Sequence, residues 1–164
     1  MKWLYLIRHG IAEDPRPGQE DGARALTAKG VEKTGEIAKR LGQWGWRWDV
    51  ILTSPLLRAQ QTAEILWRAG LAPQVEVFAD LAPGGSLEEL WRWWQGYGEY
   101  EQVAVVGHQP DLALWLAQIL GGQPQSYLLK KAGVAWVELA SLRAGQGILL
   151  AFLPPKLILG ESKA

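Results

Sequence analysis

Short runs of β-branched and apolar residues alternate along this chain with segments of helical periodicity, and this alternation constrains the fold more than any other feature. The runs that predict strands are 2–7, 49–53, 75–78, 103–107, 134–139 and 148–153. The segments that predict helices are 27–43, 55–70, 86–94 and 110–121. Strands that alternate with helices indicate an α/β fold, a three-layer α/β/α sandwich around a mostly parallel sheet. A glycine-containing turn joins the last two runs, which predicts an antiparallel edge.

The helix boundaries carry recognisable signals. Thr27 and Ser86 are typical N-cap residues, and Glu89 completes a capping box with Ser86. Pro55 and Pro110 suit the first turn of a helix, because their fixed φ angle is already helical.

The chain has 164 residues, which fits one domain with a sizeable hydrophobic core. We assign residues 1–153 to the core of this domain and 154–164 to a C-terminal tail. The polar, Pro- and Gly-rich segment 13–24 is expected to be a mobile loop. It is either a plain connector or a flap that contacts a substrate.

The charge balance and composition exclude several classes of partner and site. Basic and acidic residues both number 17, which argues against nucleic acid or an anionic membrane as the main partner. No apolar stretch approaches the roughly 18 residues of a membrane-spanning helix, and no signal-peptide pattern is present. We therefore expect a cytoplasmic protein. With no cysteine and two histidines, a zinc site is disfavoured. The ten tryptophans are either packing residues or an exposed patch for a protein partner.

Charged and imidazole side chains follow three of the predicted strands. Arg8 and His9 come directly after the first, His108 follows the run 103–107, and Arg58 lies in the first turn of the helix after the run 49–53. The carboxyl ends of parallel strands line the crevice where open α/β sheets bind ligands. Two arginines, two imidazoles and helix N-termini would form an anion site there, and a phosphoryl group fits it best.

Each of these residues also has an ordinary structural interpretation. Taken singly, the sequence "RHG" can be a surface turn, His108 a hydrogen-bonded structural histidine, and Arg58 a solvated charge on a helix. Their joint occurrence at three strand ends favours a common site.

The motifs "LIRHG", "TSPLLRAQQTA" and "VVGHQP" resemble the three signatures of the histidine phosphatase superfamily, which has the phosphoglycerate-mutase-like fold. The segment "LTAKGVEKT" and the closing "AWVELASL…FLPPKLIL" resemble those of the small SixA-like phosphohistidine phosphatases. The resemblance implies that His9 is the nucleophile of a metal-independent and cofactor-independent phosphatase, and that it forms a phosphohistidine intermediate. Arg8, Arg58 and His108 would bind the phosphoryl group and stabilise the transition state. The two arginines are also expected to lower the pKa of His9 by like-charge repulsion.

Further phosphate contacts are expected from Gly10, Ser54 and Gln109. The sequence departs from the mutase-like pattern at the general acid, because Pro83 stands where those relatives have a glutamate. Possible replacements are the carboxyl groups of Glu13, Asp80 and Glu88.

A missing strong acid suits a phosphohistidine substrate, because the leaving imidazole nitrogen titrates near neutral pH whereas an alkoxide must be protonated. The segment between residue 81 and the run 103–107 has room for one helix and no lid, so an open crevice would admit a side chain of another protein. The sequence therefore predicts a phosphatase acting on a phosphohistidine-bearing protein, such as a phosphotransfer domain of a histidine-kinase relay. The alternatives are a phosphatase for small phosphate monoesters (sugar or nucleotide phosphates) and a non-catalytic phosphoprotein-binding module.

Overall fold

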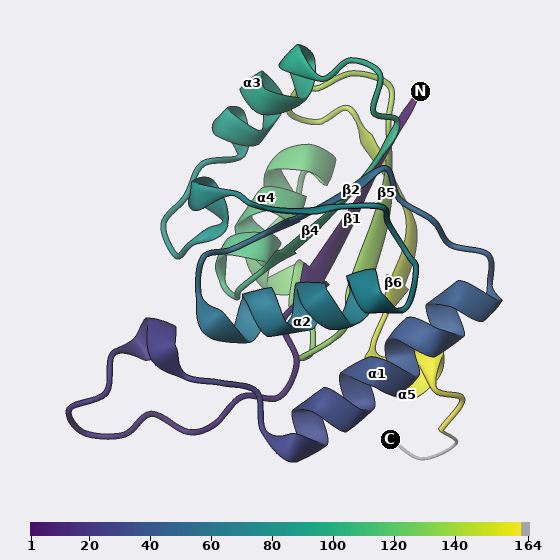
Figure 1. Cartoon of the computed structure of the whole chain (residues 1–164). Helices are drawn as coiled ribbons and strands as arrows, with labels where there is room; N and C mark the ends of the chain where they lie inside the picture. Colours follow the sequence, from purple (N-terminus) through teal and green to yellow (C-terminus); the bar gives the residue numbers. More distant parts are fainter. Residues whose placement is uncertain (162–164) are drawn as a thin grey trace.

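A computed structural model describes residues 1–161 and contains one six-stranded mixed sheet (Figure 1). Its strands are β1 (Lys2–Arg8), β2 (Val50–Thr53), β3 (Val75–Val77), β4 (Gln102–Gly107), β5 (Val134–Leu139) and β6 (Gly147–Leu153). The strand order is β3-β2-β4-β1-β5-β6; β1 to β4 are parallel, while β5 runs antiparallel to both β1 and β6. The predicted strands are all present, with ends that differ by at most one residue, and the antiparallel edge is confirmed.

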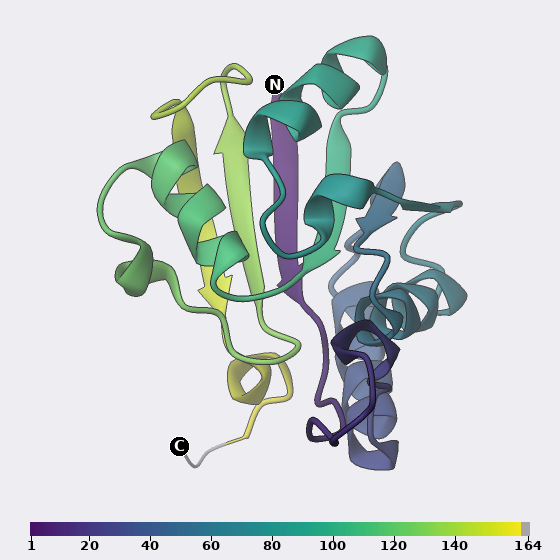
Figure 2. The same cartoon turned by 90° about the vertical axis from the view of Figure 1, so that its left-hand side faces the viewer.

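Helices cover both faces of the sheet, as the sequence predicted (Figures 1 and 2). The helices are α1 (Ala28–Gln43), α2 (Leu57–Arg68), α3 (Leu87–Gly96), α4 (Asp111–Leu120) and α5 (Pro155–Ile158). Three short 3-10 turns accompany them: η1 (Asp21–Ala23), η2 (Ala79–Leu81) and η3 (Pro124–Tyr127). One buried apolar cluster joins α3 and α4 to the sheet, and a second joins α1, α2 and α5 to the opposite face. This is the expected three-layer α/β/α arrangement.

Thr27 and Ser86 cap the starts of α1 and α3 as predicted, but the capping box with Glu89 is not formed, because the Ser86 N–H donates to Asp80 Oδ1 and Glu89 pairs with Arg92. Thr27 Oγ1 accepts the Gly30 N–H at 2.9 Å, and Ser86 Oγ accepts the Glu88 N–H at 3.2 Å. Helix α2 begins at Leu57, two residues later than predicted from Pro55. The reason is local, because Ser54 Oγ accepts the Leu56 N–H at 3.1 Å and holds this segment in a turn.

The packed core continues beyond residue 153, where we placed its end. Helix α5 lies in the expected tail, yet Ile158 is fully buried against Ile37 and Leu41 of α1. At four residues α5 is too short for periodicity to reveal it. Residues 162–164 of the tail lie outside the described residues. Within residues 1–161 no helix has the length and apolar character needed to span a bilayer.

Most tryptophans are packing residues. Trp48, Trp91, Trp94 and Trp115 are buried, whereas Trp44 and Trp67 are more than 40% exposed. Tyr5 of β1 connects one aromatic cluster, with ring centroids 5.0 Å from Trp46, 5.4 Å from Trp48 and 5.7 Å from Trp136.

Candidate active site

The three predicted junctions meet because their strands are neighbours in the sheet. Strand β4 lies between β2 and β1, so the parallel strands end side by side. Arg8 ends β1, His108 follows β4, and Arg58 lies in the first turn of α2, which follows β2. With His9 they line one pocket of about 440 Å³, in which the two imidazole centroids are 5.2 Å apart. The structure thus brings together all four residues that the sequence singled out.

His9 is held in one orientation by backbone contacts. Its side chain is buried, and Nδ1 lies 2.7 Å from the carbonyl oxygen of Gly10. A carbonyl can only accept, so Nδ1 carries the proton and Nε2 keeps its lone pair. The His9 N–H donates to Gly107 O at 3.1 Å, which ties the end of β1 to the end of β4. The ring nitrogen that can attack an electrophile is therefore Nε2.

The pKa of His9 is lowered to about 3. Burial is the largest cause, because it penalises the charged imidazolium, and the positive charges of His108, Arg58 and Arg8 lower the pKa further. The hydrogen bond to Gly10 acts in the opposite direction. The expected lowering is confirmed, but its main cause is burial rather than like charge. His9 is thus a neutral nucleophile throughout the neutral pH range.

His108 is oriented by Ser54, a fully buried residue at the end of β2. Ser54 Oγ lies 2.7 Å from His108 Nε2 and also accepts the Leu56 N–H. Burial, followed by the charge of Arg58, lowers the pKa of His108 to about 4. Ser54 acts on the pocket through His108; it does not line the pocket as a direct phosphate contact.

Arg58 is almost completely buried and is held by the loop between β1 and α1. Its Nη1 donates to Asp21 O at 2.8 Å and its Nη2 to Asp21 Oδ2 at 2.9 Å. Arg24 Nε donates to the other carboxylate oxygen of Asp21 at 2.9 Å. These hydrogen bonds, Arg58 first, hold the pKa of Asp21 below its usual value. Segment 13–24 is therefore more than a connector, because its η1 turn positions the guanidinium of Arg58.

Asp21 and Arg24 were not predicted as site residues. The available signal was their opposite charge at a spacing of three residues, in the loop that follows His9.

Four buried polar nitrogens at the site have no hydrogen-bond partner among the described residues. They are Nε of Arg8, Nε of Arg58, Nδ1 of His108 and Nε2 of Gln109. Buried donors are normally satisfied, so a cluster of unsatisfied ones indicates a missing acceptor. Arg8 is otherwise anchored by Nη1, which donates to Leu129 O at 2.9 Å. The site is suited to an oxyanion.

Gly10 and Gln109 were also expected to contact the phosphate. The Gly10 N–H donates to Thr62 Oγ1 at 3.0 Å, so Gly10 supports His9 and has no free donor for phosphate. Gln109 lines the pocket as expected; its Oε1 accepts the Ala113 N–H of α4 at 3.1 Å, and its Nε2 has no partner among the described residues.

The three expected acids do not line the pocket. Glu13 pairs with Arg16 at 3.5 Å, Asp80 Oδ1 accepts the Ser86 N–H at 3.0 Å, and Glu88 is exposed in the first turn of α3. The carboxyl groups that do line it belong to Asp14 and Asp21. Among residues 1–161, no group of three or more histidine, aspartate or glutamate side chains is arranged to hold a metal ion.

Gly10→Ala is expected to destabilise the protein. An added Cβ would lie 2.4 Å from Thr34 Oγ1 and 3.4 Å from Leu26 Cδ2, so the buried core beside His9 would be overpacked. We expect a loss of about 1–3 kcal/mol in the free energy of unfolding, measured by urea denaturation. Gly35→Ala in α1 is the control, because a Cβ there meets nothing within 4 Å and alanine favours the helix. Equal stability of Gly10→Ala and wild type would contradict the close packing at Gly10.

Acid is expected to weaken the fold before it removes the nucleophile. His9 and His108 have lowered pKa values of about 3 and about 4, whereas histidine in the unfolded chain titrates near 6.5. Between these values the unfolded state binds more protons, so the free energy of unfolding falls as the pH falls from about 6.5. Neutral His9 should keep catalysis working at about pH 5.5. Urea denaturation at about pH 7.5 and 5 tests this, and His9→Ala should show a smaller fall than wild type. An identical fall in both proteins would contradict the lowered pKa of His9.

Comparison with known proteins places these features in context. Residues 4–83 match the family model of the histidine phosphatase superfamily (branch 1). An uncharacterized protein of Picosynechococcus sp. (strain PCC 7002) is 48% identical over 144 residues, which cover 85% of this chain and 87% of that protein. The protein histidine phosphatase SixA, solved with tungstate, is 25% identical with a TM-score of 0.83, over 95% of this chain and 99% of that one. The α-ribazole phosphatase of Shigella flexneri has the same fold, with 18% identity and a TM-score of 0.73 over 93% of this chain and 96% of that one.

Proposed function

Because this chain belongs to the histidine phosphatase superfamily (branch 1) and has a SixA-like fold, we propose that it hydrolyses phosphohistidine on a protein substrate. The observation that carries the proposal is the state of His9. Its Nδ1 donates a hydrogen bond to Gly10 O and its Nε2 is unprotonated. It shares a pocket with Arg8, Arg58 and His108.

The reaction proceeds in two displacements at phosphorus. His9 Nε2 attacks in line, a P–Nε2 bond forms, and the P–N bond to the substrate imidazole breaks. The leaving imidazole takes up a proton from water. Exchange of one P–N bond for another is close to thermoneutral. A water molecule then attacks the phosphoryl group on His9, releases inorganic phosphate and leaves His9 neutral again.

Two fixed cations and one neutral imidazole stabilise both transition states. The guanidinium groups of Arg8 and Arg58 and the imidazole of His108 surround the position of the equatorial phosphoryl oxygens. Asp21 keeps Arg58 in place before substrate arrives, so little reorganisation is needed. With these groups in place the proposed reaction needs neither a metal ion nor a cofactor.

The acids at the pocket support a phosphohistidine substrate. Asp21 is kept ionised by Arg58 and Arg24, so it is a poor proton donor at neutral pH. Glu13, Asp80 and Glu88 lie elsewhere. A leaving imidazole requires less help from an acid than a leaving alkoxide does. We propose a cytoplasmic phosphotransfer domain as the kind of protein that carries this phosphohistidine.

A phosphatase for small phosphate monoesters is the second candidate. One observation favours it, because the exposed carboxyl group of Asp14 lines the pocket and could protonate an alkoxide. A binding module without catalysis is less well supported, because phosphate binding alone does not require a neutral, oriented nucleophile at His9.

Phosphate release distinguishes these functions. Purified protein is given a phosphohistidine-bearing protein and, at equal concentration, p-nitrophenyl phosphate, a sugar phosphate and a nucleotide. Fast release from phosphohistidine with slow release from the esters is expected. Faster release from an ester would assign the enzyme to small molecules and direct attention to Asp14. No release from any substrate would favour the binding module.

A further inference from the structure

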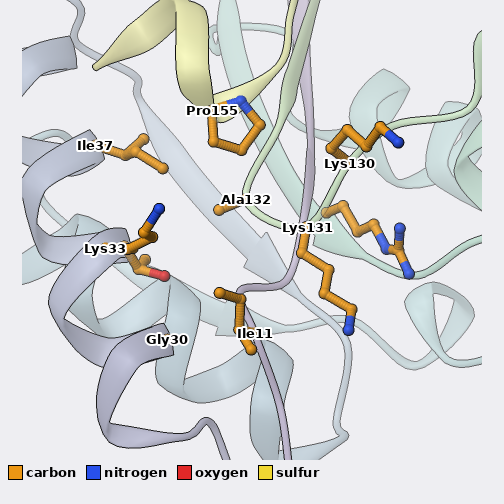
Figure 3. A pocket seen from close by; sticks show the side chains of 10 residues that line it. Ile11, Gly30, Lys33, Ile37, Lys130, Lys131, Ala132 and Pro155 are labelled. Carbon is orange, nitrogen blue, oxygen red and sulfur yellow. The ribbon is translucent and has the colours of Figure 1, made fainter. Parts of the chain in front are cut away.

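A second pocket adjoins the catalytic one. It has a volume of about 330 Å³ and lies between α1, the loop that precedes β5 and the start of α5 (Figure 3). Arg8 and Lys131 line both pockets, so the two are direct neighbours. The reaction proposed above does not use this second pocket.

The second pocket combines an apolar floor with a positive rim. Ile11, Ile37, Ala132 and Pro155 supply the floor (Figure 3). Lysines supply the rim, Lys33 from α1 and Lys130 and Lys131 from the facing loop; no acidic residue lines the pocket (Figure 3). The surface is therefore complementary to a ligand with a short hydrocarbon stem and a negative end.

The rim lysines are available to a ligand. Lys130 and Lys131 are exposed, and neither forms an ion pair with another described residue. Lys33 Nζ lies 3.7 Å from Glu161 Oε1, a long and partly exposed pair of the kind that contributes little. A carboxylate entering the pocket can replace Glu161 at modest cost.

The wall of the second pocket contains a polar group without a partner. Thr34 is 1% exposed, and its Oγ1 has no hydrogen-bond partner among the described residues. The same atom packs against Gly10, so Thr34 joins the wall of the second pocket to the backbone beside His9.

The loop that carries two of the lysines is fixed to the catalytic backbone. The Ala132 N–H is shared between Arg8 O at 3.0 Å and His9 O at 3.1 Å. Ala132 has φ of +64°, a left-handed conformation that is uncommon for a residue with a side chain. A tight turn closed by Gly133 N–H and Lys130 O, at 2.7 Å, maintains it. The second pocket thus has a set position relative to His9.

From this geometry we propose that the second pocket binds a glutamate side chain of the protein substrate, next to its phosphohistidine. Glutamate has the methylene stem and the carboxylate that the floor and rim require. Residues one helical turn apart lie about 5–6 Å from each other, which suits two pockets that share Arg8 and Lys131. The inference rests on the proposed function and adds a specificity for acidic sequences around the phosphohistidine.

Two phosphohistidine peptides test this specificity. They are identical except that the residues three and four positions away from the phosphohistidine are glutamate in one and the isosteric glutamine in the other. For wild type, kcat/KM is expected to be roughly 10-fold higher on the glutamate peptide, the size of one hydrogen bond to a charged group. Lys33→Glu is expected to bring the ratio of the two kcat/KM values to about 1. Lys130→Glu, in the exposed loop, is a second variant with the same expectation.

Lys39→Glu is the matched control. It carries the same charge change on the same helix, but Lys39 is exposed and does not line the second pocket, so the wild-type ratio should persist. A wild-type ratio of 1 would overturn the inference and leave the proposed function standing. The inference also fails if Lys39→Glu lowers the ratio as far as Lys33→Glu does, because the preference would then follow net charge. Turnover of p-nitrophenyl phosphate with no turnover of either peptide would overturn both.

Discussion

His9→Ala is expected to lower kcat for phosphate release by roughly 10⁴- to 10⁶-fold, the range found when a catalytic nucleophile is removed. No other side chain can replace it. His108 is the second imidazole of the pocket, but its Nε2 accepts the hydroxyl proton of Ser54 at 2.7 Å, so its Nδ1 carries the ring proton and has no lone pair for attack. The remaining groups, Arg8 and Arg58, are cations that bind phosphate and cannot attack it.

Two measurements test the prediction for His9→Ala. One is phosphate release from the phosphohistidine protein and from p-nitrophenyl phosphate. The other is a brief incubation with radiolabelled substrate followed by quenching in base, in which a phosphohistidine survives. Wild type should retain label on the protein and His9→Ala should retain none. Tryptophan fluorescence establishes that the variant is folded. Label on folded His9→Ala, or turnover within tenfold of wild type, would show that another group is the nucleophile.

Arg58→Ala is expected to reduce kcat/KM by about 10³-fold while leaving the fold intact. The guanidinium is 4% exposed and faces the pocket beside His9 and His108. Its loss removes a charge from the oxygens of the transition state and frees Asp21, whose carboxylate would then repel the substrate phosphate. The buried apolar clusters do not include Arg58, so stability should change less than activity.

The control for Arg58 is Arg68→Ala on the same helix. Arg68 pairs with Glu64 at 2.7 Å on the exposed side of α2 and lies outside the pocket. Its removal should leave kcat/KM unchanged and alter stability by a few tenths of a kcal/mol at most. If Arg58→Ala kept near-normal turnover, the placement of its guanidinium at the phosphate would be wrong.

The central part of this site follows from the sequence because it depends on regular elements. Strand ends and first helical turns are fixed by local periodicity, and the strand order then brings Arg8, His9, Arg58 and His108 to one edge of the sheet. The hydrogen-bond partners of individual side chains were harder to predict. Ser54 stands at a strand end as expected, but its side chain meets His108 before any ligand.

The loop contributions could not be predicted in this way. Asp21 reaches Arg58 only because of the path of segment 13–24, and no periodic pattern specifies that path. The candidate acids Glu13, Asp80 and Glu88 were chosen because they lie close in sequence to His9 or to Pro83. In the structure Asp80 accepts a backbone N–H from Ser86 within its own turn, and Pro83 lines the pocket in its place. Hydrogen bonds formed across such turns decide which carboxyl group faces a site.

Because the catalytic residues lie at the ends of β1, β2 and β4, catalytic activity requires all three strands to be in place. Arg8 and His9, Arg58, and His108 come from three distant segments that are brought together by the pairing of β4 with its two neighbours. A proteolytic fragment, or a state in which one of these strands has detached, lacks the active-site residue that this strand positions. Turnover should therefore disappear in step with global unfolding as denaturant is raised. For this protein, an assay of residual activity in a damaged or aged sample counts the molecules that are still fully native.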